Sequence, residues 1–474
     1  MDIAVVGAGY VGLVTSACLA QMENQVVCVE NDPAKLALLH GGGMPIYEEG
    51  LAELVTRNVA AERLSFTDDL AGTVQAAQVV FLCVGTPPGS GGQPDLSQIE
   101  AVATAIGQAI DSRYRVIVTK STVPVGSGDW VSSLIREAFC DTADAPSGLE
   151  AVRPAAARGG VAVAEPVNLS LPYFDVVSNP EFLREGSAIQ DMLFPDRIVL
   201  GSSSPRALAV MRDLYRPLLD QTVEWNGSCR RRGPVPLVET DLSSAEMIKY
   251  AANAFLATKI SFINEIANIC ERTGADVRSV ARGIGLDHRI GEAFLQAGIG
   301  WGGSCFPKDV AALTAMAGDY GYEAPLLSAV RQVNSQQRLL VVQKLQERLK
   351  VLKGKTIGLL GLAFKPGTDD LRDAPALTLA HRLHELGAKV RAYDPHAAAK
   401  ASRLALPLVL VADFERLAQD ADALVLVTEW PEFRNLPFRE LARQMRFPLI
   451  VDGRNSLDRE RVIASGFEYL GIGR

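Results

Sequence analysis

The sequence lacks any apolar run close to the roughly 20 residues that a helix needs to cross a bilayer. Its strand-like apolar pattern begins at residue 3, which leaves no room for a signal peptide. A surplus of positive charge is also missing, because 47 Lys and Arg face 55 Asp and Glu. The dense basic run Arg230-Arg231-Arg232 is short enough to be a solvated loop. We therefore expect a cytoplasmic protein that binds neither nucleic acid nor a membrane surface.

Cysteine is too scattered for a disulfide framework. The seven cysteines are odd in number and show no metal-ligand spacing. This pattern fits a reducing compartment and predicts no bound metal.

The length of 474 residues exceeds what one hydrophobic core organises, so two to four domains are expected.

What is present begins with a glycine motif. Residues 3–12, I-A-V-V-G-A-G-Y-V-G, join a buried strand to a helix through Gly7, Gly9 and Gly12, and a second strand then ends in Glu30. Such glycines make a turn that lets a pyrophosphate approach a helix N-terminus, and an acid at this distance binds the adenosine ribose. Because a carboxylate would repel a 2′-phosphate, the pattern predicts NAD rather than NADP.

Other residues of this half are candidates for cofactor contacts. Tyr10 and Val11 lie inside the glycine motif, and Lys35 either contacts the ribose or solvates a helix face. Thr86 and Thr122 follow two more buried-strand patterns. Ligands of a doubly wound sheet lie beyond the carboxyl ends of its strands, where these hydroxyls would meet the cofactor. Either threonine could equally cap a loop.

Two stretches interrupt the pattern. Residues from about 141 to 171 are rich in Ala, Pro, Gly and Arg without an apolar period, and residues 226–236 contain the arginine run. Both are expected to be loop insertions. Between them a strand pattern runs into a polar turn at residues 179–186, N-P-E-F-L-R-E-G, whose carboxylates would by themselves be ordinary surface groups.

The longest helical pattern runs from about Ser243, a possible N-cap, to the stop signal at Gly274. Lys249 and Asn253 are four residues apart and share one face of it. Flanking apolar residues would partly bury the lysine, which suits it to proton transfer or oxyanion stabilisation. The ordinary alternative is a solvated lysine. Apolar residues on several sides suit this helix to a spine between domains and to a dimer seam.

A cysteine follows a glycine-rich loop at residues 300–309, G-W-G-G-S-C-F-P-K-D. Pro307 suits the first turn of a helix, which places Cys305 at or just before a helix N-terminus. Unpaired N–H groups, the helix dipole and Lys308 would favour thiolate over thiol there, as a nucleophile requires. The alternative is a small buried apolar residue beside a tight turn.

The opening pattern returns in altered form in the last third of the chain. Strand-like runs follow in the same order at residues 356–360, 390–393, 423–427 and 449–451. We therefore predict an α/β fold of two doubly wound, Rossmann-like domains joined by the long central helix. This second half lacks the full glycine motif and offers Lys365, Arg372 and Arg454, cations that suit a phosphate-bearing substrate.

Together these stretches resemble the UDP-glucose/GDP-mannose dehydrogenase family over nearly the whole chain. The resemblance rests on GAGYVG at 7–12, PIYE at 45–48, STVP at 121–124, NPEFLREG at 179–186, KYAANAFLA at 249–257, GGSCFPKD at 302–309 and FKPGTDDLR at 364–372. It implies an NAD-binding Rossmann-like domain at residues 1–240, a central helical dimerisation region carrying the cysteine loop at 241–345, and a UDP-sugar-binding Rossmann-like domain at 346–474.

The resemblance is closest to the UDP-glucose branch and implies a four-electron oxidation of UDP-glucose to UDP-glucuronate by NAD. Cys305 would add to the aldehyde formed first, and the thiohemiacetal would be oxidised to a thioester that water hydrolyses. A thiolate supplies the tetrahedral adduct that the second oxidation needs and holds the reactive intermediate inside.

The resemblance also implies roles for five other residues. Lys249 and Asn253 would stabilise the oxyanion, while Asp309 would support Lys249 and a water molecule. Glu181 would act as a base, with Thr122 near the reacting centre.

Further ligand contacts are implied in the same way. NAD would contact Gly7, Gly9, Tyr10, Val11, Gly12, Glu30, Lys35, Thr86, Thr122, Lys308 and Arg372. UDP-sugar would contact Glu181, Phe182, Leu183, Glu185, Lys249, Asn253, Arg289, Phe294, Trp301, Gly302, Phe364, Lys365 and Arg454. Trp301 stands where the family often has Phe, and Glu30 where Asp is more usual; both changes keep the chemistry that the reaction needs.

Two other functions fit parts of the pattern. A sister 6-dehydrogenase for GDP-mannose or a UDP-N-acetylhexosamine would share the chemistry, although residues 285–291 look like the UDP-glucose branch. A non-catalytic NAD-sensing scaffold is the other alternative. The joint presence of Cys305, Lys249 and Asn253 speaks against it. For both enzyme hypotheses, the UDP-glucose enzyme and the sister 6-dehydrogenase, the expected partners are a nucleotide sugar and further copies of the chain, as a homodimer or larger homo-oligomer.

Overall fold

The computed structural model describes residues 1–141, 173–225 and 233–474. Nearly all of the insertion predicted at about residues 141–171 lies outside the described residues, as does the arginine run. The chain divides into two compact units, Met1–Pro88 with Pro94–Lys249, and Gly89–Gln93 with Tyr250–Arg474.

The first unit is built on one sheet with the strand order β3-β2-β1-β4-β5-β6-β7-β8. The strands from β3 to β6 in this order pair in parallel, as the doubly wound prediction requires. β7 runs antiparallel to β6, and β8 pairs in parallel with β7. The strands are β1 (Asp2–Val6), β2 (Gln25–Val29), β3 (Leu64–Thr67), β4 (Val79–Leu82), β5 (Arg115–Thr119), β6 (Phe174–Ser178), β7 (Ile198–Gly201) and β8 (Leu237–Thr240).

Side-chain caps fix where several helices of this unit begin. Asp32 accepts hydrogen bonds from two N–H groups at the start of α2, and Ser204 accepts one at the start of α8. In contrast, α1 starts at Gly9 without a side-chain cap. The helices are α1 (Tyr10–Gln21), α2 (Pro33–His40), α3 (Leu51–Ala60), α4 (Leu70–Ala76), α5 (Ser97–Ala109), α6 (Ser127–Cys140), α7 (Ala188–Leu193) and α8 (Pro205–Leu219).

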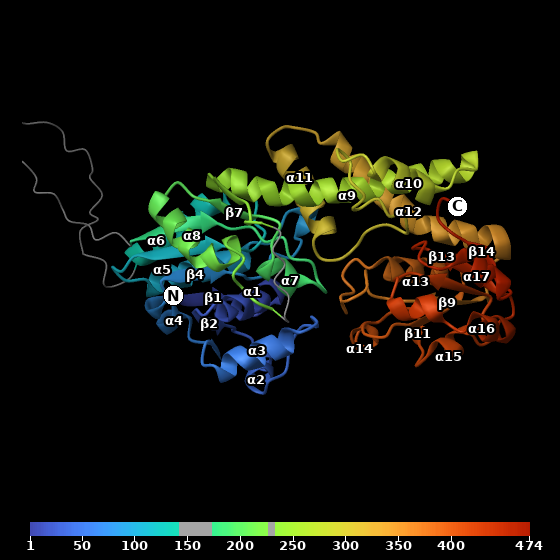
Figure 1. Ribbon diagram of the computed structural model, residues 1–474, viewed down its shortest axis with the longest axis horizontal. Helices are drawn as coiled ribbons and strands as arrows, with labels where there is room; N and C mark the ends of the chain where they lie inside the picture. Colours follow the sequence, from blue (N-terminus) through green and yellow to red (C-terminus); the bar gives the residue numbers. More distant parts are fainter. Residues whose placement is uncertain (142–172, 226–232) are drawn as a thin grey trace, which may run out of the picture. The chain divides into compact units, whose positions relative to one another are not determined.

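The long helix α9, Leu242–Thr273, is continuous (Figure 1), and the division between the units falls within it after Lys249. The expected N-cap at Ser243 is wrong. The helix begins one residue earlier, and Asp241 accepts hydrogen bonds from the backbone N–H and the hydroxyl of Ser244 (2.8 and 2.7 Å). Aspartate before the first turn caps a helix as well as serine does, so the local sequence could not decide between Asp241 and Ser243 as the N-cap. None of the helices within the described ranges has the length and apolarity of a membrane span.

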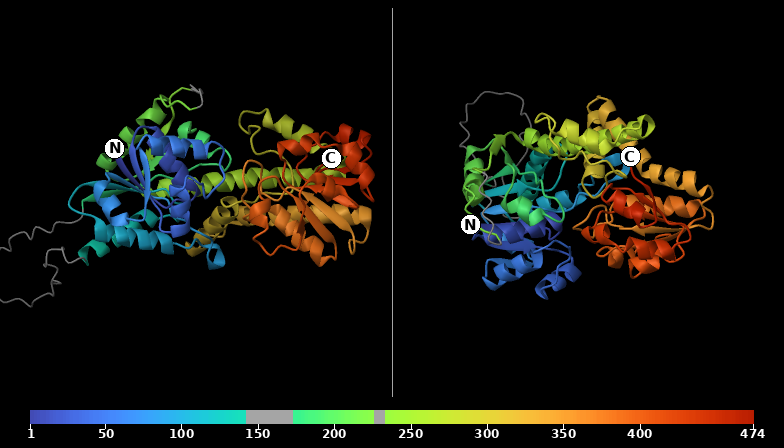
Figure 2. Two further views of the ribbon diagram at one scale, coloured as in Figure 1. Left: turned by 90° about the horizontal axis from the view of Figure 1, so that it is seen from below. Right: turned by 45° about the vertical axis from the view of Figure 1, so that its right-hand side comes forward.

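The second unit repeats the same arrangement in a sheet of order β11-β10-β9-β12-β13-β14, in which neighbouring strands pair in parallel. Figure 2 shows its strands, in orange and red, with helices on either side. The predicted return of the opening pattern is therefore confirmed. The strands are β9 (Thr356–Leu360), β10 (Lys389–Tyr393), β11 (Val409–Leu410), β12 (Ala423–Leu426), β13 (Leu449–Asp452) and β14 (Glu468–Leu470).

The helices of the second unit are of very unequal length, from one turn to the 25 residues of α12. They are α10 (Val277–Gly285), α11 (Phe306–Asp319), α12 (Pro325–Leu349), α13 (Pro375–Glu385), α14 (Ala398–Ala401), α15 (Phe414–Ala418), α16 (Phe438–Gln444) and α17 (Arg459–Ala464), with 3-10 turns η1 (Ser90–Gly92) and η2 (Pro431–Asn435).

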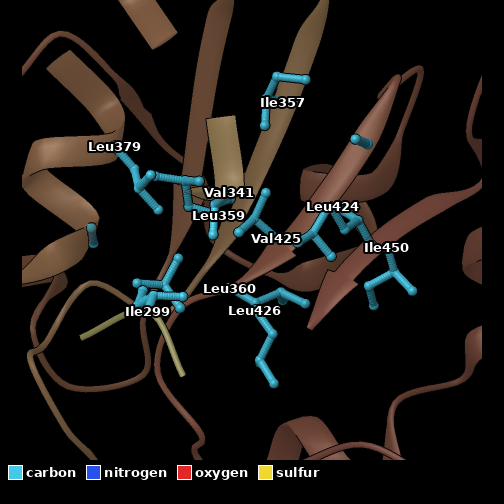
Figure 3. Packing of buried hydrophobic residues seen from close by; sticks show 14 of the residues in the cluster. Ile299, Val341, Ile357, Leu359, Leu360, Leu379, Leu424, Val425, Leu426 and Ile450 are labelled. Carbon is cyan, nitrogen blue, oxygen red and sulfur yellow. The ribbon is translucent and has the colours of Figure 1, made fainter. Parts of the chain in front are cut away.

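Ile299, which directly precedes the cysteine loop, belongs to the hydrophobic core of the second unit. Ile299 is fully buried in the cluster formed by β9, β12, β13 and α12, and Figure 3 shows it among these side chains. Its backbone N–H donates to the carbonyl of Gly453 (2.9 Å). A Cβ on Gly453 would lie 2.3 Å from the Ile299 side chain, so only glycine allows this approach. The loop that carries Cys305 is thus anchored in the sheet core.

Ile299→Ala is expected to destabilise the second unit by about 2–5 kcal/mol, the usual cost of truncating a fully buried large aliphatic side chain. Urea unfolding followed by tryptophan fluorescence measures the change. Ile463→Ala, which truncates a side chain that is 47% exposed on α17, serves as the matched control and should leave stability nearly unchanged. Equal midpoints for both variants would contradict the anchoring role.

Candidate active site

The glycine motif forms a tight passage from β1 into α1. Gly7 has a φ of +102°, a left-handed conformation that favours glycine. A Cβ on Gly12 would lie 1.8 Å from the carbonyl oxygen of Gly7, so the turn and the helix approach too closely for a side chain. A Cβ on Gly9 would meet nothing within 4 Å. Open space before an uncapped helix N-terminus fits the pyrophosphate of a dinucleotide.

Glu30 stands beside this passage at the end of β2. Its side chain is 5% exposed, and its carboxylate accepts hydrogen bonds from the N–H groups of Ala8 (3.1 Å) and Asp32 (3.0 Å). Lys35 lies beside it, with Nζ 3.5 Å from Glu30 Oε2. The turn itself therefore holds the predicted ribose-binding acid in place.

Thr86 and Thr122 follow β4 and β5 and lie together. The hydroxyl of Thr86 donates to the backbone carbonyl of Thr122 (2.9 Å). This is the loop-capping arrangement that was one of the two alternatives. Contact of either hydroxyl with the cofactor stays a prediction.

Tyr10 and Val11 are both partly buried against the core of the first unit. The hydroxyl of Tyr10 donates to the carboxylate of Glu48 and accepts a hydrogen bond from the N–H of Gly186 (3.2 Å). The structure therefore connects Tyr10 to the loop of residues 179–187, a partner that the sequence did not indicate.

A buried ion pair joins that loop to α9. Lys249 Nζ lies 2.6 Å from Glu181 Oε1 and donates to the Glu181 carbonyl (2.7 Å), with each side chain 5% exposed. Burial by itself would raise the pKa of Glu181. The ammonium of Lys249 and the N–H of Leu183 outweigh it, and the pKa lies below the usual range. The ring of Phe182 packs beside Lys249, whose Nζ lies 5.6 Å from the ring centroid.

Two charged residues beside this pair were missed by sequence reasoning. Lys120 is buried and donates to Asn179 Oδ1 (3.1 Å), and desolvation lowers its pKa. Glu246, also buried, accepts hydrogen bonds from the N–H groups of Gly126 (2.7 Å) and Gly128 (2.8 Å) at the start of α6. Lys120 and Glu246 line a small cavity of about 10 Å³ together with Lys249. Glu246 could have been found, because it precedes Lys249 by three residues on the same helical face.

Cys305 is the residue from which α11 begins, as predicted. It is the N-cap of α11 without a side-chain cap, Pro307 lies in the first turn, and the Cys305 carbonyl accepts a hydrogen bond from the N–H of Asp309 (2.8 Å). Ser304 Oγ lies 3.5 Å from the Cys305 sulfur. The sulfur thus sits where unpaired N–H groups and the helix dipole favour negative charge.

Burial separates Cys305 from most other cysteines. Desolvation raises the pKa of Cys28 and of Cys83 to about 12, so these thiols stay protonated. Cys305 is partly exposed, as is Cys140. The buried cysteines in the described part of the chain are Cys18, Cys28, Cys83 and Cys270.

Hydrogen bonds from α12 hold the loop before Cys305. The amide of Asn334 accepts a hydrogen bond from the N–H of Trp301 (2.8 Å) and donates to its carbonyl (3.0 Å), and Arg338 donates to the same carbonyl (2.7 Å). The Trp301 side chain is 7% exposed and its indole N–H donates to Ser261 (3.0 Å). Trp301 is therefore part of the packing that fixes the loop, and its contact with substrate stays a prediction.

The next glycines are required by packing within the unit. A Cβ on Gly302 would lie 2.2 Å from the Asp373 carbonyl oxygen, and one on Gly303 would lie 2.7 Å from the Phe364 ring. The N–H of Gly303 donates to the Arg372 carbonyl (3.0 Å). The cysteine loop is thus packed directly against residues 364–373, the motif that opens the second Rossmann-like half.

Asn253 and Asp309 meet within the second unit. Asn253 Nδ2 donates to Asp309 Oδ2 (2.6 Å), and both side chains are buried. Lys308 Nζ lies 2.9 Å from the other carboxylate oxygen. Three predicted residues, Asn253, Lys308 and Asp309, therefore cluster at the start of α11, where Lys308 and Asp309 follow Cys305 by three and four residues.

The cations proposed to contact the ligands are bonded to other groups of the protein. Arg454 donates to the carbonyls of Gly300 (3.1 Å) and Phe364 (3.2 Å), so it ties the cysteine loop to the second half. Arg372 is held by Asp370, and Arg289, with a 78% exposed side chain, by Asp287.

The remaining predicted contacts are aromatic or flank these loops. The Lys365 ammonium lies 5.6 Å from the Phe364 ring centroid, and the Phe294 ring lies 6.3 Å from that of Phe306. Leu183 and Glu185 lie in the same loop as Glu181 and are partly exposed. Their roles toward UDP-sugar stay predictions.

Three family models match the chain in order. They are the NAD binding domain of the UDP-glucose/GDP-mannose dehydrogenase family at residues 1–219, its central domain at residues 243–336 and its UDP binding domain at residues 358–459. The chain belongs to this family. The resemblance drawn from the motifs is thereby confirmed, and so are NAD as the cofactor and a nucleotide sugar as the class of substrate.

Relatives within the family align over the whole chain. The UDP-glucose 6-dehydrogenase of Rhizobium meliloti (strain 1021) is 46% identical over 479 residues, covering 100% of both proteins. A UDP-glucose 6-dehydrogenase of Bacillus subtilis (strain 168) is 45% identical over 473 residues, covering 100% of this chain and 93% of that protein. The solved UDP-glucose dehydrogenase of the hyperthermophilic archaeon Pyrobaculum islandicum is 35% identical, with a TM-score of 0.85 and coverage of 99% and 97%. The predicted fold class and an NAD-dependent dehydrogenase are confirmed.

Glu246→Gln is expected to flatten the pH dependence of stability. Burial, reinforced by Asp129 and Asp241 and opposed by the two glycine N–H groups, raises the pKa of Glu246 from 4.5 to about 7. Between these values the folded protein holds a proton that the unfolded chain has released, so stability falls as the pH rises through this window. At roughly 1.4 kcal/mol per pKa unit the loss approaches about 3 kcal/mol.

Thermal unfolding of both proteins between pH 5 and 8 measures this difference. Glu137→Gln, which changes an exposed carboxylate on α6, is the control and should keep the wild-type pH profile. The same profile in Glu246→Gln would show that this carboxyl does not titrate there.

Proposed function

We propose that the protein oxidises C6 of UDP-glucose from alcohol to carboxylate, giving UDP-glucuronate, with Cys305 as the covalent nucleophile. The observation that carries the proposal is the position of Cys305, a partly exposed residue at the N-terminus of α11, where no side chain caps the helix. The choice of UDP-glucose is supported by the 45–46% identity to the two UDP-glucose 6-dehydrogenases over the full chain. When bound, NAD supplies the hydride acceptor for both oxidations.

Cys305 acts between the two oxidations. Its thiolate sulfur attacks the aldehyde carbon, a C–S bond forms, and the carbonyl electron pair moves to oxygen. Loss of a second hydride from this thiohemiacetal leaves a thioester on Cys305. Water attacks the thioester carbon, the C–S bond breaks, and the carboxylate leaves the restored thiol behind.

Asn253 and Lys249 stabilise the negative charge that develops on the sugar oxygen. Asp309 accepts one N–H of the Asn253 amide (2.6 Å), which orients the amide and leaves its second N–H for the substrate. The side-chain nitrogen of Lys249 is held in place by the Glu181 carboxylate at 2.6 Å. Donors that are fixed before the reaction stabilise an oxyanion without the cost of reorganisation.

Glu181 changes character when substrate engages Lys249. Paired with the ammonium, its carboxylate has a pKa below the usual range and is a weak base. If a substrate oxygen takes the ammonium, a buried carboxylate loses its cation, and desolvation then raises its pKa. The same residue thereby becomes a competent acceptor for a proton from water or from the thiohemiacetal hydroxyl.

UDP-glucose with excess NAD is expected to release two NADH per sugar, measured by absorbance, because oxidation of an alcohol to a carboxylate removes four electrons. Cys305→Ser should stall after the first oxidation, with no more than one NADH per sugar and no uronate, because a serine adduct is a poor vehicle for the second. Cys140→Ser, which changes the other partly exposed cysteine among the described residues, is the control. One NADH per sugar in the wild type, or unimpaired uronate formation by Cys305→Ser, would refute the mechanism.

The same assay with GDP-mannose and UDP-N-acetylhexosamines decides the substrate. Higher kcat/KM for one of these sugars than for UDP-glucose would replace the substrate assignment and leave the chemistry intact. No NADH with any nucleotide sugar would favour a non-catalytic scaffold.

We also propose that α9 forms a homodimer seam. Phe255, Phe262 and Ile269 are 65%, 48% and 49% exposed and recur every seven residues, so they lie on one face of the helix. Such a row of large apolar side chains on a helix is typical of an interface.

Phe262→Glu is expected to shift the protein toward monomers, because a buried unpaired carboxylate is costly. Light scattering after size exclusion reports the mass. Ile463→Glu, at a comparably exposed position on α17, should leave the mass unchanged. An unchanged mass for Phe262→Glu, or a monomeric wild type, would remove this seam from the proposal.

A further inference from the structure

Glu48 is buried in the first unit and bonded on both carboxylate oxygens. Oε1 accepts a hydrogen bond from the N–H of Ala188 (2.7 Å), and Oε2 accepts one from the N–H of Gly186 (2.6 Å). The hydroxyl of Tyr10 donates to Oε2 as well. One side chain, 7% exposed, therefore gathers three donors from two distant parts of the chain.

These donors belong to structures on which the reaction depends. Tyr10 is the first residue of α1, immediately after Gly9, where the pyrophosphate of the cofactor is expected. Gly186 and Ala188 flank the N-cap of α7 and end the loop of residues 179–187, which carries Glu181. Glu48 and Tyr10 thus join the helix of the glycine motif to the loop that positions Glu181 and Lys249.

The other end of this loop is already fixed by buried side chains. Asn179 accepts hydrogen bonds from Lys120 (3.1 Å) and from the hydroxyl of Tyr215 (2.6 Å), and it donates to the carbonyl of Val199 (2.9 Å). Glu181 follows two residues later. The loop therefore has one anchor before Glu181 and a second, built by Glu48, after it.

We infer that Glu48 is a positioning residue for the dehydrogenase reaction, which acts by holding residues 179–187 and α1 in one fixed arrangement. This inference rests on the proposed function, because it takes Glu181 and its neighbours to be the substrate loop. It gives a role to the PIYE motif at residues 45–48, which the mechanism leaves without one. It also explains why the Tyr10 hydroxyl points to a carboxylate.

The chemistry of the contact requires a carboxylate in particular. All three partners are donors, and a carboxylate offers only acceptors, so each hydrogen bond is satisfied. Desolvation, and then the neighbouring Glu48, raises the pKa of Tyr10 well above its usual range, so the phenol remains a donor throughout the working pH range. Glutamine has the same size but would turn an N–H group toward an N–H group.

The test compares wild type, Glu48→Gln, Tyr10→Phe and Glu49→Gln in two measurements. Glu49 is the adjacent carboxylate and is exposed, so Glu49→Gln is the matched control. The first measurement is amide hydrogen exchange of Gly186 and Ala188 in the protein without ligands. The second is steady-state kinetics with UDP-glucose and NAD varied separately.

Glu48→Gln is expected to speed exchange at Gly186 and Ala188 at least about tenfold, since each tenfold step corresponds to about 1.4 kcal/mol of lost protection, within the range for a buried hydrogen bond. It should also lower kcat/KM for UDP-glucose about tenfold or more, with the KM for NAD changed less than about threefold. Tyr10→Phe removes one donor of the three and should change both readouts in the same direction but less. Glu49→Gln should match the wild type.

Wild-type exchange at Gly186 and Ala188 in Glu48→Gln would overturn the inference. So would faster exchange with unchanged kcat/KM for UDP-glucose, because Glu48 would then serve stability alone. If Glu48→Gln does not fold, Tyr10→Phe decides by the same two readouts. A wild type that oxidises no nucleotide sugar would instead refute the proposed function, and the exchange measurement would still report on the contact.

Discussion

Every α-helix begins with N–H groups that have no partner inside the helix, and the helices next to the predicted site residues of each unit meet this requirement in two ways. At α6 and α7 the N–H groups are taken by carboxylates from distant parts of the chain, Glu246 and Glu48. At α1 and α11 no side chain caps the first residue. The closed helix ends hold loops in place. The open ends of α1 and α11 have positive potential, which suits the proposed binding of a pyrophosphate at one and of a thiolate at the other.

The buried charges in the first unit follow the same rule, that a polar group removed from water needs a partner. Lys249 and Glu181 would each be costly alone in a desolvated place, and together they satisfy one another. A pair of this kind is stable at rest yet responds to a ligand, because any group that engages one partner changes the pKa of the other. Lys120 adds a third ionisable group beside the pair, and its own pKa is lowered by burial.

Much of this arrangement could be predicted from sequence where the signal is local. The passage from β1 into α1, the acid at Glu30 and the start of α11 at Cys305 each depend on residues within a short window. The same holds for the two doubly wound sheets, which follow from repeated strand and helix patterns, although the antiparallel pairing of β6 with β7 was not predicted.

The rest depends on partners far apart in sequence. Glu48 meets Ala188 across 140 residues, and Gly126 meets Glu246 across 120. A single sequence shows that such carboxylates exist but not which N–H groups they reach. The same limit applies to Asn334 and Arg338, whose only local signal is a helical spacing of four, and to Tyr10, whose position inside the motif suggested a ligand contact and not a link to Glu48.

The close packing at Gly302 has a consequence for how the cysteine loop is studied. Any side chain there would push against the backbone of Asp373 before it reached a bound molecule. An inactive protein with alanine at this position would report a displaced loop, whatever the reactivity of the sulfur three residues later. A loss of activity in a mutational scan of this loop therefore reports a displaced backbone before it reports a lost catalytic group. Only substitutions that leave the main chain in place can distinguish the two effects.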